Sequence, residues 1–212
     1  MSKISLDSLD LAALLCSRVC HDVISPVGAI VNGLEVLEDE NDTSMRDFAF
    51  ELIRKSSQQA SARLQFSRLA FGAAGSAGSM IDLSDAEQVS RGLFPEDKVA
   101  VSWKGPVAYF PKNKVKLLLN LVMVASSAIP RGGKMDIVVS GEAENCDFVL
   151  RCKGPNSRIP PHAEELLAGE SETGTVDAHS VQTFYAGMVA RACDMKVTLA
   201  EEGDEIVIRA VS

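Results

Sequence analysis

The chain has 212 residues, 46% of them hydrophobic, which is enough for one large domain or two small ones. Its formal net charge of -8 argues against binding to nucleic acid or to an anionic membrane, because both would repel it at long range. No window approaches the ~18 consecutive apolar residues of a membrane span, and the N-terminus does not resemble a signal peptide. We therefore expect a soluble cytoplasmic protein, with no nucleic acid and no membrane among its partners.

The first predicted element is a long amphipathic helix. Its apolar residues follow one another at alternating intervals of three and four, which is a coiled-coil-like seam. These residues are Leu6, Leu9, Ala13, Cys16, Cys20, Val23, Val27, Ile30, Leu34 and Leu37. A polar break over residues 39–44 ends this helix, and a second helix with a weaker seam follows over residues 45–71.

The two helices together predict a helical hairpin in residues 1–74. A hairpin alone leaves one face of each helix in water, so another element must cover it. A second copy of the chain is the simplest candidate, because a two-fold axis through two hairpins closes a four-helix bundle. We therefore expect a homodimer.

Residues 72–79 contain only glycine, alanine and serine, which is typical of a linker, and a second domain is predicted over residues 80–212. Short, often alternating segments rich in β-branched residues predict strands there. They cover residues 99–103, 135–139, 148–152, 195–199 and 205–209, with helices over 112–129 and 181–193. The predicted fold class is α+β: the dimeric helical bundle is followed by an α/β sandwich with helices on one face of a mixed sheet.

The five cysteines, at positions 16, 20, 146, 152 and 193, include no Cys-x-x-Cys pair. No histidine lies near them at the spacing of a zinc site. We expect reduced thiols that are mostly buried.

His21 is the candidate nucleophile. One residue's step from the apolar seam turns about 100° around the helix, so its imidazole should be exposed at the edge of the seam. Asp22 can accept an N–H hydrogen bond from the ring, which leaves the other ring nitrogen free to attack. Ser17, Ser25 and Gly28 are small residues on the same face, so a partner protein could approach closely. The alternative is a solvated histidine without a role.

Residues 21–26 read HDVISP, with a proline inside the helix. Pro26 removes a backbone hydrogen bond and clashes with the carbonyl of Asp22, at a cost of ~3 kcal/mol. The stretch resembles the H-box of two-component histidine kinases, in which the phosphorylated histidine is followed by an acidic residue and then, five residues on, by proline. The predicted hairpin and α/β domain are similar to that family's dimerisation and ATP-binding domains, so the resemblance covers nearly the whole chain.

The second domain departs from the kinases where they bind ATP. Residues 118–130 resemble the kinase N-box, but Val124 stands where an asparagine should ligate Mg²⁺, which requires oxygen. Cys152 stands in place of the aspartate that reads adenine, and Asn156 in place of a glycine. Residues 176–182 replace the glycine-rich lid, whose backbone would wrap the phosphates. The resemblance therefore implies a protein without ATP-dependent kinase activity, and we expect this chain to bind no cofactor.

A protein with a phosphorylatable histidine and no ATP site is similar to the histidine phosphotransferases of alphaproteobacteria. Residues 17–33 closely resemble the first helix of that family. That resemblance implies a phosphotransferase that relays a phosphoryl group through His21. The group would come from the receiver aspartate of a hybrid histidine kinase and pass to response regulators that control cell-cycle transcription. Because this chain has no evident metal site, Mg²⁺ and a cationic side chain should come from the receiver domain.

We predict that His21 and Asp22 are catalytic, with Asp22 orienting the imidazole. The patch that docks partner receivers is predicted at Ser17, Arg18, Ile24, Ser25, Gly28, Leu64 and Arg68. Arg18 could face either the phosphate or an acidic loop of the receiver. His162 and His179 are interpreted as loop or helix-start residues rather than ligands. The competing hypotheses are a divergent ATP-dependent histidine kinase and a non-catalytic dimeric adaptor that binds receivers.

Overall fold

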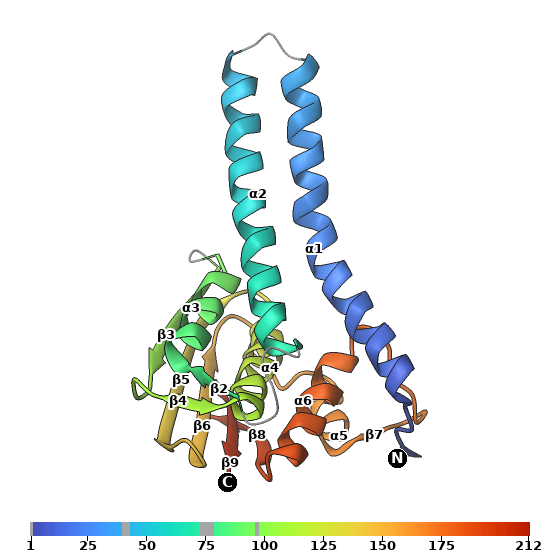
Figure 1. Cartoon of the computed structure of the whole chain (residues 1–212), viewed down its shortest axis with the longest axis vertical. Helices are drawn as coiled ribbons and strands as arrows, with labels where there is room; N and C mark the ends of the chain where they lie inside the picture. The colour runs from blue at the N-terminus through green and yellow to red at the C-terminus, as the bar shows by residue number, and fades with distance from the viewer. Residues whose placement is uncertain (1, 40–42, 73–78, 96–97) are drawn as a thin grey trace.

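The computed structural model describes residues 2–39, 43–72, 79–95 and 98–212. Two long helices, α1 (Ser8–Asp39) and α2 (Thr43–Ala70), run antiparallel and extend away from an α/β unit (Figure 1). Most of the predicted linker and of the polar break, residues 73–78 and 40–42, lies outside the described residues. The mixed α+β class is confirmed.

Gly33 sets how closely α1 and α2 approach each other. It is buried between the helices, and a Cβ atom at this position would lie 2.6 Å from Cγ1 of Ile53. The same atom would lie 3.3 Å from the backbone oxygen of Ala49. Any larger residue would therefore force the two helices apart at this level.

The α/β unit is built on a five-stranded sheet with the strand order β3-β5-β6-β9-β8. Its strands are β3 (Val99–Lys104), β5 (Gly133–Glu142), β6 (Asn145–Lys153), β8 (Lys196–Glu202) and β9 (Glu205–Val211). β3 and β5 are parallel, and the other neighbours are antiparallel. All five correspond to strands predicted from the sequence.

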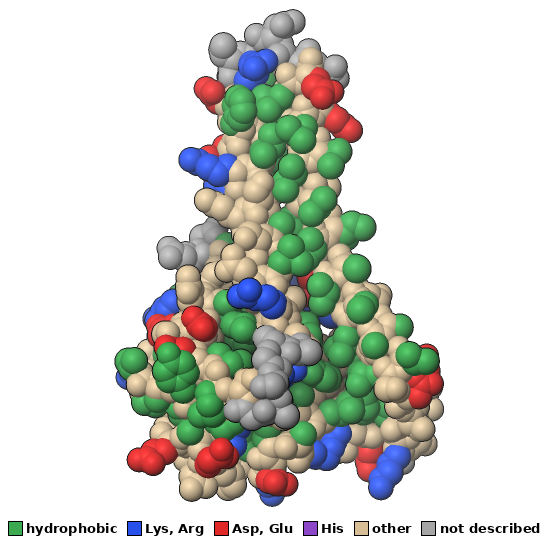
Figure 2. Space-filling model, viewed as in Figure 1, with side chains coloured by type: hydrophobic (Ala, Val, Ile, Leu, Met, Phe, Trp, Pro, Cys, Tyr) green, Lys and Arg blue, Asp and Glu red, His purple; other side chains and the backbone are tan. Residues whose placement is uncertain are grey.

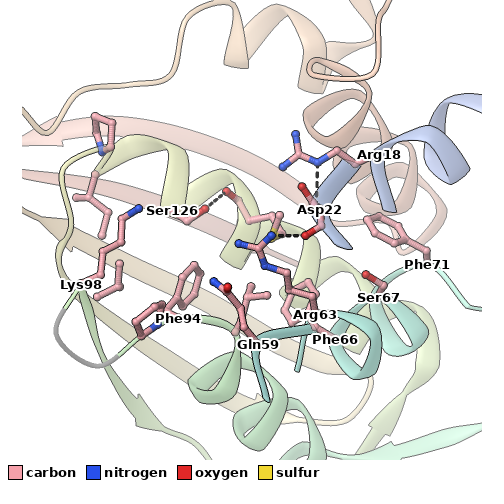
Figure 3. A pocket seen from close by; sticks show the side chains of 16 residues that line it. Arg18, Asp22, Gln59, Arg63, Phe66, Ser67, Phe71, Phe94, Lys98 and Ser126 are labelled. Atoms are coloured by element: carbon pink, nitrogen blue, oxygen red, sulfur yellow. Dashed lines mark hydrogen bonds and ion pairs between the residues drawn. The ribbon is translucent and has the colours of Figure 1, made fainter. Parts of the chain in front are cut away.

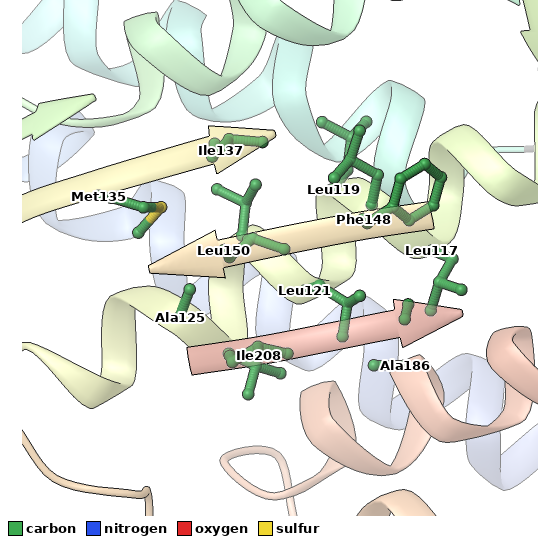
Figure 4. Packing of buried hydrophobic residues seen from close by; sticks show 14 of the residues in the cluster. Leu117, Leu119, Leu121, Ala125, Met135, Ile137, Phe148, Leu150, Ala186 and Ile208 are labelled. Carbon is green, nitrogen blue, oxygen red and sulfur yellow. The ribbon is translucent and has the colours of Figure 1, made fainter. Parts of the chain in front are cut away.

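Helices cover one face of this sheet, as the alternation of buried and part-exposed residues along β5 and β6 requires. The helices are α3 (Leu83–Leu93), α4 (Lys112–Ala128), α5 (Ala163–Ala168) and α6 (Val181–Ala192). Leu117 and Leu121 of α4 pack against Leu150 and Ile208 of the sheet (Figure 4). Each is fully buried, which contributes roughly 1.5–3 kcal/mol per side chain. α4 and α6 were predicted, whereas α3 and α5 were not.

Two short ribbons complete the structure, and one of them links the N-terminus to the α/β unit. β2 (Met80–Asp82) pairs with β4 (Tyr109–Pro111) beside α4. β1 (Ser2–Lys3), which precedes α1, pairs with β7 (Glu170–Ser171), and the amide of Ile4 donates to the carbonyl of Gly169 at 2.9 Å. The chain therefore contacts the α/β unit before it enters α1.

A buried amide cluster joins the end of α2 to the α/β unit. Asn120 lies on α4 and is fully buried; its Nδ2 donates to the carbonyls of Ala70 at 3.0 Å and Lys116 at 2.7 Å. Nε2 of Gln182, on α6, donates to Oδ1 of Asn120 at 2.6 Å. Asn120 lies within residues 118–130, the stretch that resembles the kinase N-box, and in this fold it holds α2, α4 and α6 together.

Replacing Asn120 with alanine should lower the free energy of unfolding by ~2–4 kcal/mol, because three hydrogen bonds are lost and Gln182 is left buried without its acceptor. Urea denaturation measures this change. Asn113→Ala is the matched control, since Asn113 is an exposed residue of the same helix, and it should change stability by less than ~0.5 kcal/mol. A loss at Asn120 as small as that of the control would contradict the role assigned to this cluster.

The cysteines differ from the expectation in part. Cys146 and Cys152 are buried and Cys193 is half-buried, but Cys16 and Cys20 are exposed on α1, so the prediction of burial is wrong for these two in a single chain. The reason is that the apolar seam of α1 faces outward. Burial raises the pKa of Cys152 to about 12 and that of Cys193 to about 11, so both thiols stay protonated at neutral pH.

α1 is long and apolar enough to span a membrane by length and composition alone, over Ser8–Glu38. The expectation that no segment resembles a membrane span is therefore too strong. A single such helix is a weak indication, and Arg18 and Asp22 lie near its middle, where charges are costly in hydrocarbon. The apolar character of α1 instead reflects an outward-facing stripe of side chains.

Candidate functional site

His21 lies near the middle of α1 with 66% of its side chain exposed. Its Nδ1 is 3.5 Å from Oδ1 of Asp22, the next residue in the chain. The structure therefore brings together the two residues that the sequence predicted to be catalytic. Because Nδ1 faces the carboxylate, Nε2 is the ring nitrogen left for a reaction partner.

Arg18 holds the same carboxylate from its other side. Its Nε donates to Oδ2 of Asp22 at 3.2 Å, one helical turn away, and both side chains are largely buried. Asp22 is thus shared between a guanidinium and the imidazole. The sequence left two roles open for Arg18, contact with phosphate or with an acidic loop of the receiver. Neither contact is present in the single chain, where Arg18 instead holds Asp22.

The mid-helix proline has a structural partner on α2. Pro26 is buried, and since it has no N–H it leaves the carbonyl of Asp22 without its usual helical donor. Nη1 of Arg63 donates to that carbonyl (Figure 3). α1 bends in this region, and its N-terminal half diverges from α2 to lie beside α6 (Figure 1). The bend that carries His21 is therefore fastened to α2 by Arg63.

This arrangement predicts that Arg63 and Pro26 are energetically coupled. Arg63→Met should lower the free energy of unfolding by ~1–2 kcal/mol in the natural chain, because the carbonyl of Asp22 loses its donor. In a Pro26→Ala background the loss should be smaller by about 1 kcal/mol, since residue 26 then supplies the missing N–H. A double-mutant cycle in urea measures the coupling. Equal losses in both backgrounds would contradict it.

His179, in the turn before α6, contacts His21. The two ring centroids are 5.7 Å apart and the rings lie nearly edge to face, at 79°. The interpretation of His179 as a helix-start residue is correct, but its contact with His21 could not be predicted from the sequence. Oδ1 of Asp177 fixes the turn by accepting from the amides of His179 at 3.0 Å and Ser180 at 2.8 Å. Hydrogen bonds led by the Ser180 hydroxyl lower the pKa of Asp177.

The predicted site residues divide into two groups. The predicted catalytic residues His21 and Asp22 are in contact with each other, and Arg18 of the predicted docking patch contacts Asp22. The remaining members lie on the surface of the two helices: Ser17, Ile24, Ser25, Leu64 and Arg68 are exposed, and a Cβ atom at Gly28 would meet no described atom within 4 Å. The bond from Arg63 to Asp22 places Leu64 at the level of His21 along the helices. Space for a partner is therefore open beside the imidazole.

A stripe of exposed hydrophobic residues runs along both helices (Figure 2). We call it the helical stripe; it consists of Ile24, Val27, Val31 and Leu34 on α1 and Met45, Phe48 and Leu64 on α2. On α1 its members keep the intervals of three and four residues found in the sequence. Such a contiguous apolar surface is typical of a protein interface.

A cavity of about 350 Å³ lies next to Asp22, between the two helices and the α/β unit (Figure 3). The side chains of Arg18, Arg63 and Lys98 give it a basic wall, and Phe66 and Phe94 an apolar one. His21 does not line this cavity. The imidazole therefore faces the surroundings of the helices rather than a closed chamber.

Two of the positions at which the kinases bind ATP are occupied by core residues in this protein. Val124 is 1% exposed and Cys152 fully buried, so both belong to the core. A second cavity, of about 420 Å³, lies beside residues 176–182. It is lined by the carboxylates of Glu165, Glu172 and Asp177, which would repel a triphosphate. Among the described residues no cluster of His, Cys, Asp or Glu could hold a metal ion.

An exposed imidazole on a helix, oriented by a carboxylate and lying beside an α/β unit, is suited to carrying a phosphoryl group. The family model described as the histidine phosphotransferase C-terminal domain matches residues 83–205. The chain is also 46% identical to the protein phosphotransferase ChpT of Brucella abortus (strain 2308), over 98% of each chain. This chain therefore belongs to the histidine phosphotransferase family, and it is a phosphotransferase that acts in a phosphorelay.

One of two similar solved structures supports this assignment. A structure titled as a bacterial phosphotransferase has a TM-score of 0.90 and 44% identity, covering 99% of this chain and all of that one. The histidine kinase AdeS of Acinetobacter baumannii covers 91% of this chain and 97% of that one, at 13% identity and a TM-score of 0.46. The second resemblance is too distant to support a conclusion about this chain.

Proposed function

We propose that His21 carries the phosphoryl group, receiving it from the receiver aspartate of a hybrid histidine kinase and passing it to the receiver aspartates of response regulators. The observation that carries this proposal is the geometry of His21. Its ring is exposed, while its Nδ1 faces a carboxylate that Arg18 holds in place. An imidazole oriented in this way needs little reorganisation before it attacks.

The transfer consists of one displacement at phosphorus. The lone pair on Nε2 of His21 attacks the acyl phosphate of the donor, so that an N–P bond forms while the P–O bond to the donor aspartate breaks. The aspartate leaves with the electron pair of that bond. The proton on Nδ1 stays in place, and Asp22 stabilises the positive charge that develops on the ring. Delivery to the next receiver is the same step in reverse.

This chain supplies the nucleophile and its orientation, while the receiver would supply Mg²⁺ and a cationic side chain to neutralise the phosphoryl oxygens. The receiver would dock on Ser17, Ser25 and Gly28, where small residues permit close approach. Ile24 and Leu64 are exposed and would provide its apolar contacts.

The proposal includes a homodimer, because the helical stripe is too extensive to remain in water. A second copy would cover the stripe and complete a four-helix bundle. Residues 1–74 would then serve transfer and dimerisation, and residues 80–212 would form a degenerate kinase-like domain that adds receiver contacts. We place the protein in the cytoplasm with its receivers.

The experiment that tests this function compares two sources of phosphoryl groups. The protein is incubated with labelled ATP and Mg²⁺, first alone and then with an autophosphorylating hybrid histidine kinase. We expect label on this chain only in the second case. Val124 and Cys152 are core residues that cannot ligate Mg²⁺ or read adenine, and the acidic second cavity would repel a nucleotide. Label from ATP alone would identify a divergent histidine kinase, and no label in either case a receiver-binding adaptor.

A further inference from the structure

The two imidazoles of His21 and His179 come from segments far apart in the sequence. With ring centroids 5.7 Å apart, a phosphoryl group on His21 would lie next to the ring of His179. We propose that His179 donates an N–H hydrogen bond to a phosphoryl oxygen of phosphorylated His21 and so prolongs the life of that intermediate. This inference rests on the proposed function of His21.

The position of His179 is fixed by its surroundings. Besides the two amides, Oδ1 of Asp177 accepts from the hydroxyl of Ser180 at 2.6 Å, so the whole turn is hydrogen-bonded. Gln182 follows in the first turn of α6 and is bonded to the buried Asn120. His179 therefore approaches His21 from a rigid part of the fold, which a hydrogen-bond donor to a reacting group requires.

The charges around the pair explain why a donor is needed there. Asp22 lies beside His21, and Asp177 lies on the turn of His179. Across the second cavity stand Glu165 of α5 and Glu172 after β7, both acidic. Arg18 is already bonded to Asp22. A phosphoryl dianion on His21 would thus lie beside the carboxylate of Asp22, and the imidazole of His179 faces it as a hydrogen-bond donor.

The chemistry assigned to His179 involves no bond to phosphorus. Its ring keeps its own proton and shares it with a phosphoryl oxygen, while the N–P bond on His21 stays intact. Because this hydrogen bond is made to the phosphorylated state itself, it stabilises the intermediate relative to the transition state of its hydrolysis and slows loss of the phosphoryl group to water. His179 is therefore a positioning residue for the intermediate rather than a second nucleophile.

The test uses phosphoramidate, a small donor that phosphorylates histidine without any receiver. The half-life of phosphorylated His21 is measured at about pH 6 and about pH 8, which bracket imidazole titration. We expect His179→Gln to shorten the half-life about fivefold at the lower pH and less than about twofold at the higher pH. His179→Arg carries a permanent charge and should preserve the half-life at both.

His162→Gln is the matched control, since His162 is also exposed and lines the second cavity. It should leave the half-life unchanged. Equal half-lives of wild type and His179→Gln at both pH values would overturn this inference alone. An equal loss in His162→Gln would overturn it too, because the effect would then not depend on contact with His21. If phosphoramidate labels some other residue and never His21, the proposed function fails instead.

Discussion

His21→Ala is expected to abolish phosphoryl uptake from a phosphorylated receiver, lowering its rate by at least about 10³-fold. The substitution removes the only atom that forms a bond to phosphorus in the proposed step. Asp22 and Arg18 remain, but they act on the reaction only through the imidazole. The measurement is transfer of label from a phosphorylated hybrid-kinase receiver to this chain, followed over time.

The same variant should fold normally, which separates loss of chemistry from loss of structure. Because most of the His21 side chain is in solvent, its removal should change the free energy of unfolding by less than ~0.5 kcal/mol. Asp22 keeps its bond to Arg18 in the variant, so the bend in α1 is not disturbed. If the folded variant accepts label at the wild-type rate, the phosphoryl carrier is another residue.

Placing charges in the helical stripe should dissociate the proposed dimer. Val27→Glu combined with Leu34→Glu alters two members of the stripe in each chain. Burial of one valine or leucine contributes roughly 1.5–3 kcal/mol, and the new carboxylates would oppose burial as well. The four changes in a dimer should weaken association by at least about 10³-fold. Sedimentation equilibrium distinguishes the mass of one chain from that of two.

Val107→Glu provides a control with the same chemistry at a different place. Val107 is 95% exposed in the α/β unit, away from the helical stripe, and its replacement should leave the dimer intact. Both variants should keep the circular dichroism of the wild type. A wild type that sediments as a single chain at micromolar concentration would refute the dimer itself.

Elements with a regular apolar period were predictable from the sequence. The long seam of α1 and the alternating strands of the sheet each repeat a pattern over many residues, and the structure has them in the predicted places. β1 and β7 are only two residues long and α5 only six, so no period can emerge in them. Their existence depends on tertiary pairing that the local sequence does not encode.

The candidate site shows the same division. Asp22 could be assigned to His21 because the two are adjacent in the chain. The mid-helix position of Pro26 indicated that the carbonyl of Asp22 lacks its helical hydrogen-bond donor. The residue that replaces this donor, Arg63, lies 41 residues farther along the chain and could not be identified from the sequence. His179 is farther away still and has no neighbouring motif that points to α1. A single sequence identifies the nucleophile, whereas contacts from distant segments require the fold.

The pairing of β1 with β7 fastens the N-terminal end of α1 to the α/β unit, and the bond from Asn120 to Ala70 fastens the C-terminal end of α2. An enzyme that phosphorylates its own histidine from a nucleotide must bring the two together and then separate them, which calls for a hinge. A phosphotransferase that receives its phosphoryl group from another protein does not need this domain movement. The donor and acceptor receivers can instead bind one after the other at the same fixed docking site. Because both need the same nitrogen of His21, they exclude each other. The rate of phosphoryl transfer through the relay is then set by how quickly one receiver dissociates and the next one binds.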